Sequence, residues 1–328
     1  MNNFWQKLPK PFFAIAPMAN VTDSVFRKLF AKYGKPDVVW TEFVSADGLN
    51  SVGQKRLLVD LVYSENERPI VAQLFTGHPE EMKKAAGLIA KLGFDGLDIN
   101  MGCPDRAVQK QGGGAALIKN LKAALEVLNA AREAVIPVSV KTRIGFNVVD
   151  LTWIEFLLKQ HLPALTVHLR TRKEMSDEPA HWDLMPAIIK MRNEISPRTL
   201  IIGNGDVETL EQAREFAEKY GCDGIMIGRG IFGKPWFFEG IRQFNKGNIE
   251  RSKSKTPGER LKILVEHAKL FEKTYCGKKH IKNFDVMKKH FKAYVSGWDG
   301  AKELRTKLMG TKNVGEVEEI IEEYFERE

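Results

Sequence analysis

One pattern repeats eight times along this sequence: a short apolar or β-branched run is followed by a stretch with helical periodicity. Most of the runs stay apolar on both faces until their last residues, as parallel strands covered by helices do. The runs are Pro11–Met18, Val38–Val44, Ile70–Phe75, Gly96–Gly102, Val138–Gly145, Ala164–Arg170, Leu200–Asp206 and Gly224–Gly230. Amphipathic stretches between them include Glu80–Leu92, Leu121–Ala134 and Leu210–Tyr220. The repeat predicts an α/β fold, a (β/α)8 (TIM) barrel rather than an open sheet.

A polar segment separates this repeat from the end of the chain. Residues 247–258, GNIERSKSKTPG, contain both Gly and Pro and are typical of a linker. Helical patterning dominates after this segment, and no convincing strand follows it. We therefore expect a barrel domain over residues 1–246, a linker over 247–258 and a helical domain over 259–328.

Positive charge is concentrated in the helical part of the chain. The formal net charge is +8, and residues 251–312 hold 17 Lys and Arg against 6 Asp and Glu. A basic block of this kind is typical of a surface that binds a polyanion. Charge alone slightly favours the plainer interpretation, which is a solvated helical surface.

Cysteine usage and hydropathy indicate the compartment. The three cysteines, Cys103, Cys222 and Cys276, form no C-x-x-C pair and no metal-ligand spacing with histidine. We therefore expect no disulfide framework, no metal site and a reducing environment. The sequence shows neither a signal-peptide pattern nor an apolar run long enough to cross a bilayer. These features predict a cytoplasmic protein without a membrane partner, and we expect it to be monomeric.

Each apolar run becomes polar near its end. Residues two apart on a strand share a face, so these polar residues fall on common faces. They are Glu42, Gln73, Asp98 with Asn100, Lys141 with Arg143, His168 with Arg170, and Asn204 with Asp206. If the faces point inward, the polar groups converge on the mouth of the barrel, where the active sites of such barrels lie. The alternative is internal pairing of Lys141 and Arg143 with Asp98 or Glu42, although proteins rarely bury such charges for stability alone.

Two neighbouring strands end in glycine-rich turns, GNGD at 203–206 and GRG at 228–230. The loops after the last two strands of a barrel often bind phosphate through backbone N–H groups, and Arg229 adds charge there. The pair of turns therefore predicts a phosphate-bearing ligand. GRGIFG at 228–233 also matches the G-x-G-x-x-G dinucleotide pattern. We reject that reading because no strand follows it.

Cys103 follows the fourth run in DINMGCP, between Gly102 and Pro104, and GGGAAL at 112–117 comes shortly after it. A buried cysteine is more often a small apolar side chain than a reagent. That interpretation suits Cys222 and Cys276. Cys103 differs from them because it lies at the carboxyl end of a predicted strand, where a thiol would project into the barrel mouth.

The motifs APMANVTDSVFR, VAQLF, DINMGCP, VKTRIG, VHLRTR, GNGD and IGRG stand in an order that closely resembles the tRNA-dihydrouridine synthase family. The resemblance covers residues 12–245, and the helical tail agrees with the family in length and position. It implies an FMN-containing barrel followed by a helical tRNA-binding domain. The sequence departs from the family pattern at Asn20, Leu169 and Ala107, where Gly, Gly and Lys are usual, and these departures leave the tRNA position open.

The resemblance also implies roles for individual residues. Those that match flavin contacts are Pro17, Met18, Ala19, Gln73, Lys141 and His168, together with Asn204, Gly205, Asp206, Gly228 and Arg229 at the ribityl-phosphate site. Cys103 matches the proton donor. Asn100, Arg143 and Arg170 match residues near the target base.

The implied reaction is reduction of the 5,6 double bond of uridine, with NADPH as the reductant of FMN. Hydride would pass from the flavin N5 to C6, and Cys103 would protonate C5. A flavin barrel acting on a small molecule, as in dihydroorotate dehydrogenases, is the main alternative. A non-enzymatic RNA-binding module and a barrel enzyme acting on a phosphosugar are more distant ones. The basic tail favours tRNA, since a small-molecule enzyme has little use for it.

Overall fold

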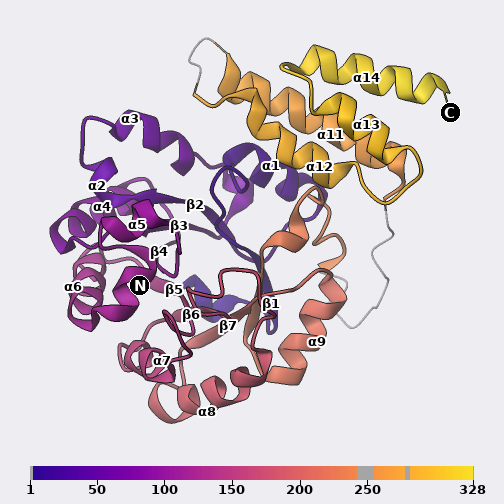
Figure 1. Ribbon diagram of the computed structural model, residues 1–328. Helices are drawn as coiled ribbons and strands as arrows, with labels where there is room; N and C mark the ends of the chain where they lie inside the picture. The colour runs from indigo at the N-terminus through magenta and orange to yellow at the C-terminus, as the bar shows by residue number, and fades with distance from the viewer. Residues whose placement is uncertain (1–2, 242–254, 278–280, 328) are drawn as a thin grey trace. The chain divides into compact units, whose positions relative to one another are not determined.

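The computed structural model describes residues 3–241, 255–277 and 281–327. All eight predicted strands are present (Figure 1). Their bounds are β1 Phe12–Ile15, β2 Val39–Ser45, β3 Ile70–Phe75, β4 Gly96–Met101, β5 Val138–Arg143, β6 Ala164–His168, β7 Leu200–Asn204 and β8 Gly224–Ile227. Most end one to three residues before the predicted bounds.

The strands form one parallel sheet in the order β1-β8-β7-β6-β5-β4-β3-β2. A bridge between Ala14 and Val38 brings its two edges together. Two hydrogen bonds support this closure: Asp37 N donates to Phe13 O at 2.9 Å, and Phe13 N donates to the Asp37 carboxylate at 2.9 Å. The predicted (β/α)8 barrel is confirmed.

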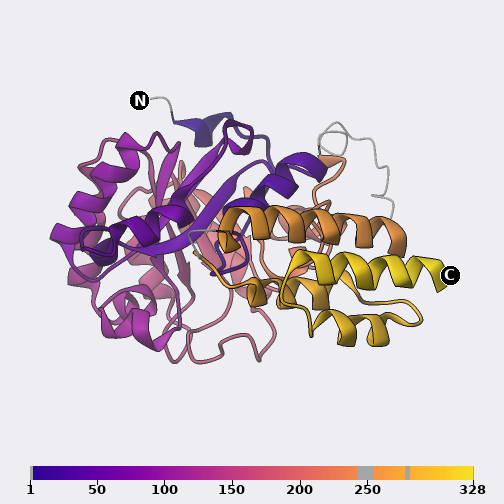
Figure 2. The ribbon, with the colours of Figure 1, turned by 90° about the horizontal axis from the view of Figure 1, so that it is seen from above.

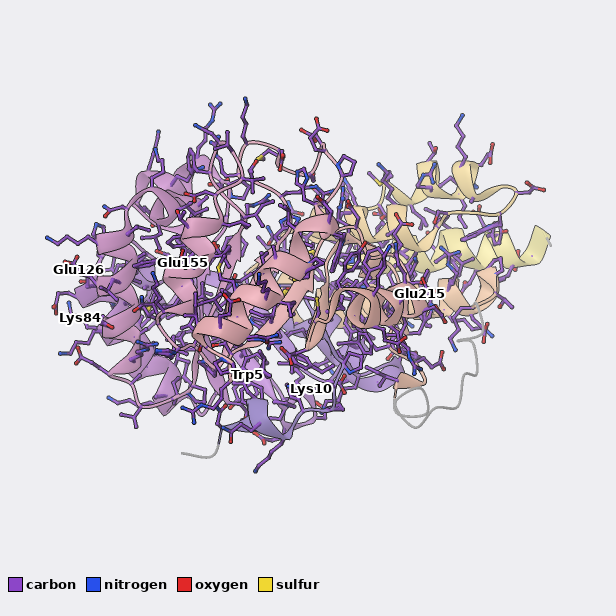
Figure 3. The ribbon with its side chains drawn as sticks, turned by 90° about the horizontal axis from the view of Figure 1, so that it is seen from below. Trp5, Lys10, Lys84, Glu126, Glu155 and Glu215 are labelled. Atoms are coloured by element: carbon purple, nitrogen blue, oxygen red, sulfur yellow. The ribbon has the colours of Figure 1, made fainter. Side chains whose placement is uncertain are left out.

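Helices surround the strands of the barrel (Figure 1). Their bounds are α2 Ala46–Leu49, α3 Gln54–Leu57, α4 Pro79–Lys91, α5 Arg106–Lys110, α6 Leu121–Arg132, α7 Leu151–Leu158, α8 Met185–Ile195 and α9 Leu210–Tyr220. α4 shows why they form, because its buried residues, Met82, Ala85, Ala86 and Ile89, follow the spacing of one helical face. Exposed charged side chains such as Lys84 and Glu126 occupy the outer surface (Figure 3).

Aromatic side chains contribute to the core inside the barrel. Trp5 precedes β1, and its ring lies 5.7 Å from that of Trp40 and 6.1 Å from that of Phe12. Gly224 makes room for this cluster, since a Cβ there would lie 2.6 Å from the ring of Phe12. Close packing of large rings therefore requires glycine at that position of β8.

The chain divides into two compact units. One contains residues 1–24 and 36–230, and the other contains residues 25–35 and 231–328. The helix α1 (Ser24–Tyr33) thus belongs mainly to the second unit, although it follows β1 in the sequence. The predicted boundary after residue 246 and most of the predicted linker lie outside the described residues.

The described part of the second unit is helical. Besides α1 it contains α11 Pro257–Phe271, α12 Met287–Tyr294, α13 Ala301–Leu308 and α14 Val314–Arg327. α11 begins with a capping box, in which Thr256 and Glu259 each accept a hydrogen bond from the other's main chain. α11 and α14 lie side by side (Figure 2). None of the described helices combines the length and apolar character that a bilayer span requires.

Two histidines lie in the core of this helical unit. His267 and His290 are fully buried, with ring centroids 4.5 Å apart, and the His267 ring stacks on Phe26 at 5.1 Å. Burial lowers the pKa of His267 to about 3 and holds the pKa of His290 well below its ordinary value. Both rings are therefore neutral in the folded protein at neutral pH.

The buried histidines predict acid sensitivity of the helical unit. As the pH falls below about 6.5, the unfolded chain binds protons at these residues and the folded chain does not, so the free energy of unfolding decreases. In His267→Phe, whose new ring can stack on Phe26 in the same way, we expect a shallower decrease between about pH 7 and about pH 5. Urea denaturation at several pH values measures the free energy of unfolding. An equally steep decrease with falling pH in the variant and the wild type would contradict the prediction.

Candidate active site

The structure brings the predicted site residues to one end of the barrel. Each lies at or just after the carboxyl end of a strand. They are Pro17, Met18 and Ala19 after β1, Gln73 on β3, Asn100 on β4 with Cys103 after it, Lys141 and Arg143 on β5, His168 on β6 with Arg170 after it, Asn204 on β7 with Gly205 and Asp206 after it, and Gly228 and Arg229 after β8. Because parallel strands point the same way, these positions share the barrel mouth.

Three buried polar side chains on β3 and β4 form a hydrogen-bonded chain. The Gln73 Nε2 donates to Asp98 Oδ2 at 2.7 Å, and the Asn100 Nδ2 donates to Gln73 Oε1 at 3.0 Å. The other oxygen of Asp98 accepts from the Ser139 hydroxyl at 2.5 Å. Burial raises the pKa of Asp98 to about 6. The buried polar groups of these side chains are therefore paired with one another.

Cys103 continues this chain. The side-chain oxygen of Asn100 accepts from Gly102 N at 3.1 Å and from Cys103 N at 2.9 Å. Ala115 N donates to Cys103 O at 3.0 Å, and Gly114 has a φ of 58°, with a Cβ there lying 2.8 Å from Cys103 O. The predicted GGGAAL segment thus packs against the cysteine. The thiol is half-buried, and burial raises its pKa.

The positive groups on β5 have no carboxylate partner among the described residues. The Lys141 Nζ donates to Asn204 Oδ1 at 3.2 Å. Arg143 donates to three main-chain oxygens, those of Gly102 at 2.8 Å, Thr171 at 3.0 Å and Met175 at 2.9 Å. Neither side chain forms an ion pair with Asp98 or Glu42 among the described contacts, although the negative charge of Asp98 acts to raise the pKa of Lys141.

Burial of these groups in a positive environment shifts their pKa values. Burial, followed by the charge of Arg143, lowers the pKa of Lys141 to about 8. Burial lowers the pKa of Arg143 to about 10. Burial and then the charges of Arg143, Lys141, Arg170 and Arg229 hold the pKa of His168 well below its ordinary value. An anionic ligand is favoured here because it relieves this excess of positive charge.

Asp206 joins two arginines at the same end of the barrel. Its carboxylate accepts from the buried Arg170 at 2.6 Å, from the exposed Arg229 at 2.8 Å and from Ala180 N at 2.8 Å. Burial opposes ionisation, but the hydrogen bonds from Arg170 and Ala180 leave the pKa of Asp206 below its ordinary value. Arg170 also donates to the main-chain oxygen of Glu178. These contacts fasten the loop after β6 to the loop after β7.

The glycine turns at the ends of β7 and β8 differ in the space beside their main chain, because Gly205 is buried and a Cβ there would lie 2.7 Å from the Ala180 side chain. Gly205 has a φ of 136° and Asp206 a φ of 50°, which glycine and aspartate tolerate better than most residues. A Cβ at Gly228 would meet only the Ala16 side chain, at 3.9 Å, so open space lies beside this residue. Room for a phosphate beside the main chain is therefore present at Gly228, and a phosphate site formed by both turns stays a prediction.

The loop after β1 reaches the same mouth. Pro17 is buried, Met18 is half-buried and Ala19 is exposed. Asn20 has a φ of 55°, and its N–H donates to the buried carboxylate of Glu42 on β2. This conformation explains why Asn can stand where Gly is usual, since both residues tolerate a positive φ.

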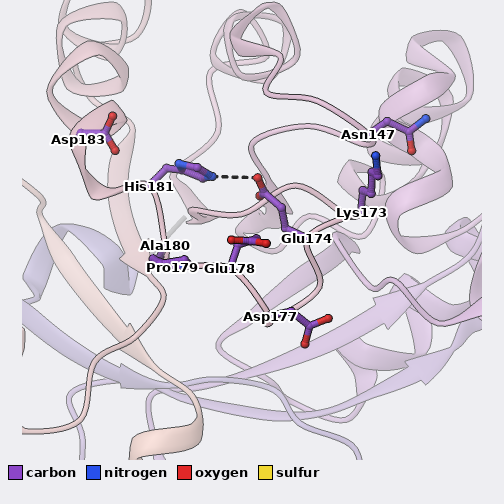
Figure 4. Close-up of a pocket in the computed structure, with 9 residues that line it drawn as sticks. All are labelled: Asn147, Lys173, Glu174, Asp177, Glu178, Pro179, Ala180, His181 and Asp183. Atoms are coloured by element: carbon purple, nitrogen blue, oxygen red, sulfur yellow. Dashed lines mark hydrogen bonds and ion pairs between the residues drawn. The ribbon is translucent and has the colours of Figure 1, made fainter.

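A cavity of about 690 Å³ lies on the segment between β6 and α8 (Figure 4). Four of its nine lining residues are acidic, namely Glu174, Asp177, Glu178 and Asp183, and Glu174 accepts from His181 at 2.9 Å. It contains none of the predicted site residues. Its acidic side chains do not suit a phosphate, so this cavity differs in charge from the positive barrel mouth. No group of three or more potential metal ligands occurs among the residues that the structure describes.

Some contacts were not foreseen from the sequence. Ser139 shares the face of Lys141 and Arg143 by its spacing of two, so that spacing could have identified it. Glu174 accepts from Thr171 N at 2.7 Å and stabilises the loop after β6, but no sequence motif marks it.

The sequence of this chain matches a known protein family over nearly its whole length. Residues 14–328 match the family model described as "Dihydrouridine synthase (Dus)". The chain belongs to the dihydrouridine synthase family. A "Probable tRNA-dihydrouridine synthase" of Staphylococcus aureus (strain COL) is 41% identical over 330 residues, covering 98% of this chain and 95% of the relative. "Probable tRNA-dihydrouridine synthase 2" of Bacillus subtilis (strain 168) is 42% identical over 328 residues, covering 99% and 97%. The predicted resemblance is confirmed, and this dihydrouridine synthase family member is an oxidoreductase.

Solved structures share the barrel with this family member. Morphinone reductase in complex with tetrahydroNAD has a TM-score of 0.52 at 13% identity, covering 74% of this chain and 89% of that one. Histamine dehydrogenase from Rhizobium sp. 4-9 has a TM-score of 0.52 at 12% identity, covering 80% and 49%. Identities this low show a common fold alone.

The two arginines on Asp206 predict unequal effects on stability. In Arg170→Gln, we expect the free energy of unfolding to fall by about 2–3 kcal/mol, because a buried charged partner is removed from a partly exposed carboxylate. Arg229→Gln is the matched control. This substitution removes an ion pair with the same carboxylate, but the side chain that is lost is exposed. We therefore expect the free energy of unfolding to fall by less than about 1 kcal/mol. Urea denaturation without added ligand measures both values, and equal losses would contradict the prediction.

Proposed function

We propose that this protein uses FMN and NADPH to reduce the 5,6 double bond of specific uridines in tRNA. Relatives that match nearly its whole length are named as probable tRNA-dihydrouridine synthases. The observation that carries the proposal is the position of Cys103, a half-buried thiol next to the Gly102 carbonyl that Arg143 holds. A proton donor thus lies beside positive groups at the mouth of a barrel.

The residues of the barrel mouth fit a flavin mononucleotide. Its phosphate suits the main-chain N–H and the open space at Gly228 and the charge of Arg229. We assign the ribityl-phosphate site to Asn204, Gly205, Asp206, Gly228 and Arg229, and the ring contacts to Pro17, Met18, Ala19, Gln73, Lys141 and His168. Asp206 contributes by orienting Arg229 rather than by touching the phosphate, because a carboxylate repels an anion.

When bound, FMN would supply the hydride that C6 of the uracil receives, with NADPH as its reductant. Cys103 supplies the proton for C5, because burial raises the pKa of its thiol and keeps the proton on Sγ at neutral pH. Lys141 and Arg143 stabilise the negative charge that develops on the uracil oxygens. The protein hydrogen bonds described for Arg143 use Nε and Nη1, which leaves Nη2 for this purpose.

We assign binding of the target base to Asn100, Arg143 and Arg170. The uridine has to leave its stack to reach these residues, as for other enzymes that act on a base. Phosphate contacts outside the pocket come from the helical domain, where residues 251–312 carry 17 basic against 6 acidic side chains. Family membership favours tRNA over the alternative of a small-molecule substrate. A monomer in the cytoplasm remains our expectation.

The proton-donor role predicts a separation of two activities. Cys103→Ala should bind FMN and let NADPH reduce it, but form dihydrouridine at least about 100-fold more slowly, because the acid for C5 is missing. Mass spectrometry of nucleosides from treated tRNA measures the product. Cys222→Ala, at a buried position before β8, is the matched control and should keep its activity. Normal product formation by Cys103→Ala would contradict the role.

The basic helical domain predicts salt-sensitive binding. We expect the affinity for tRNA to fall at least about tenfold between about 50 and about 200 mM salt, because counterions are released from the RNA. Lys292 is exposed on α12, so Lys292→Gln should reduce the salt dependence. Lys122→Gln on the barrel helix α6 should not. A flat salt response in a filter-binding assay would argue against the domain as an RNA platform. Lys278 and Lys279, which the sequence also suggests for testing, lie outside the described residues.

A further inference from the structure

We infer that Asp98 is a positioning residue that sets the main chain at Cys103 through a hydrogen-bond relay of Gln73 and Asn100. The inference rests on the proposed role of Cys103 and deepens it, because it identifies what holds the proton donor in place. Asp98 lies on β4, where the cysteine loop begins, and it has no part in the proposed chemistry.

The relay has only one consistent direction. At one end, the ionised carboxylate of Asp98 can only accept, so Gln73 must turn its Nε2 toward it. At the other end, the N–H groups of Gly102 and Cys103 can only donate, so Asn100 must turn its oxygen toward them. The amide group of Asn100 is then left to face the oxygen of Gln73, and this contact is present.

Reversing any single amide would break this agreement. If the Gln73 side chain turned by half a revolution, its oxygen would face the Asp98 carboxylate and its nitrogen would face the nitrogen of Asn100. Two like atoms would then meet at each contact. Asp98 therefore fixes the orientation of Gln73, Gln73 fixes Asn100, and Asn100 fixes the loop.

Because the relay is buried, the loss of one of its hydrogen bonds costs free energy. Gln73 and Asp98 are 0% exposed and Asn100 is 6% exposed, so water cannot replace a lost partner. The main chain of Gln73 is fixed as well, since its N–H donates to the Thr41 hydroxyl at 3.1 Å. A mismatch at Asp98 therefore has to be relieved by movement, and the end of the relay that lies beyond the strands is the loop at Cys103.

The groups around Asp98 come from three neighbouring strands. They are Trp40 on β2, Gln73 on β3, and Ser139 and Lys141 on β5. Among them Gln73 is the one that is hydrogen-bonded to Asn100, and Asn100 accepts from the main chain at Cys103. The Ser139 hydroxyl occupies the other carboxylate oxygen, so it stabilises Asp98 without competing for the relay. A suitable substitution therefore has to exchange a hydrogen-bond donor for an acceptor in the relay without changing the size or shape of the side chain.

Two isosteric substitutions do this. Asn100→Asp keeps an oxygen for Gly102 and Cys103 but cannot donate to Gln73, so two carboxylates compete for one amide nitrogen. Asp98→Asn keeps an acceptor for Gln73, so it is tolerated. The double variant restores agreement with the direction reversed: Asn at 98 donates to the Gln73 oxygen, and the Gln73 nitrogen donates to Asp at 100.

The readout is hydrogen exchange at the amides of Gly102 and Cys103, followed by mass spectrometry of the peptide that contains them. We expect Asn100→Asp to exchange about tenfold faster than wild type, and Asp98→Asn to stay within about threefold. The double variant should return to within about threefold of wild type. Asp95→Asn is the matched control. This residue pairs with Arg68 and Ile70 N near the amino end of β4, so the exchange at Cys103 should not change.

The inference is overturned if the double variant exchanges as fast as Asn100→Asp, or if it fails to fold. Alkylation of the buried Cys222 in the same samples reports unfolding of the barrel and separates it from local movement. If Asn100→Asp alone unfolds, the folded double variant still supports the relay. None of these measurements needs tRNA or NADPH, so failure of the relay and failure of the proposed function are distinguishable.

Discussion

Positive charge at the barrel mouth is the constraint on which the arrangement of the site depends. Lys141 and Arg143 carry charge into a largely buried place where none of the described carboxylates pairs with them. Arg143 is stabilised instead by main-chain oxygens from the loops after β4 and β6, so the charge that a ligand needs also holds those loops. Asp206 is engaged by Arg170 and Arg229, which leaves the mouth positive overall.

Much of the fold could be predicted from the sequence because its signals are local. Apolar runs covered by helices are typical of a parallel barrel, and β3 has the predicted bounds, as does α9, which ends at Gly221 with a φ of 72°. The alternation of side chains placed Lys141 and Arg143 on one face. The convergence of strand ends then followed from the barrel, since its strands all run in the same direction.

The pairing of the site residues could not be predicted, because it depends on contacts between loops distant in sequence. Arg170 and Asp206 are 36 residues apart, and only the folded chain shows that Arg170 holds the turn after β7. Likewise, no sequence pattern shows that the side-chain oxygen of Asn100 accepts from Gly102 N and Cys103 N. The membership of α1 in the helical unit is also invisible in a sequence that places it directly after β1.

The closure of the barrel has a consequence for synthesis of the chain. β1 pairs along its length with β8, and at its other edge it makes the bridge between Ala14 and Val38 and the hydrogen bonds between Phe13 and Asp37. The first strand to leave the ribosome therefore lacks its main pairing partner until the last strand, more than 200 residues later, has been made. Until then Phe12–Ile15 is an apolar strand with open edges, which is the kind of segment that chaperones shield in a nascent chain.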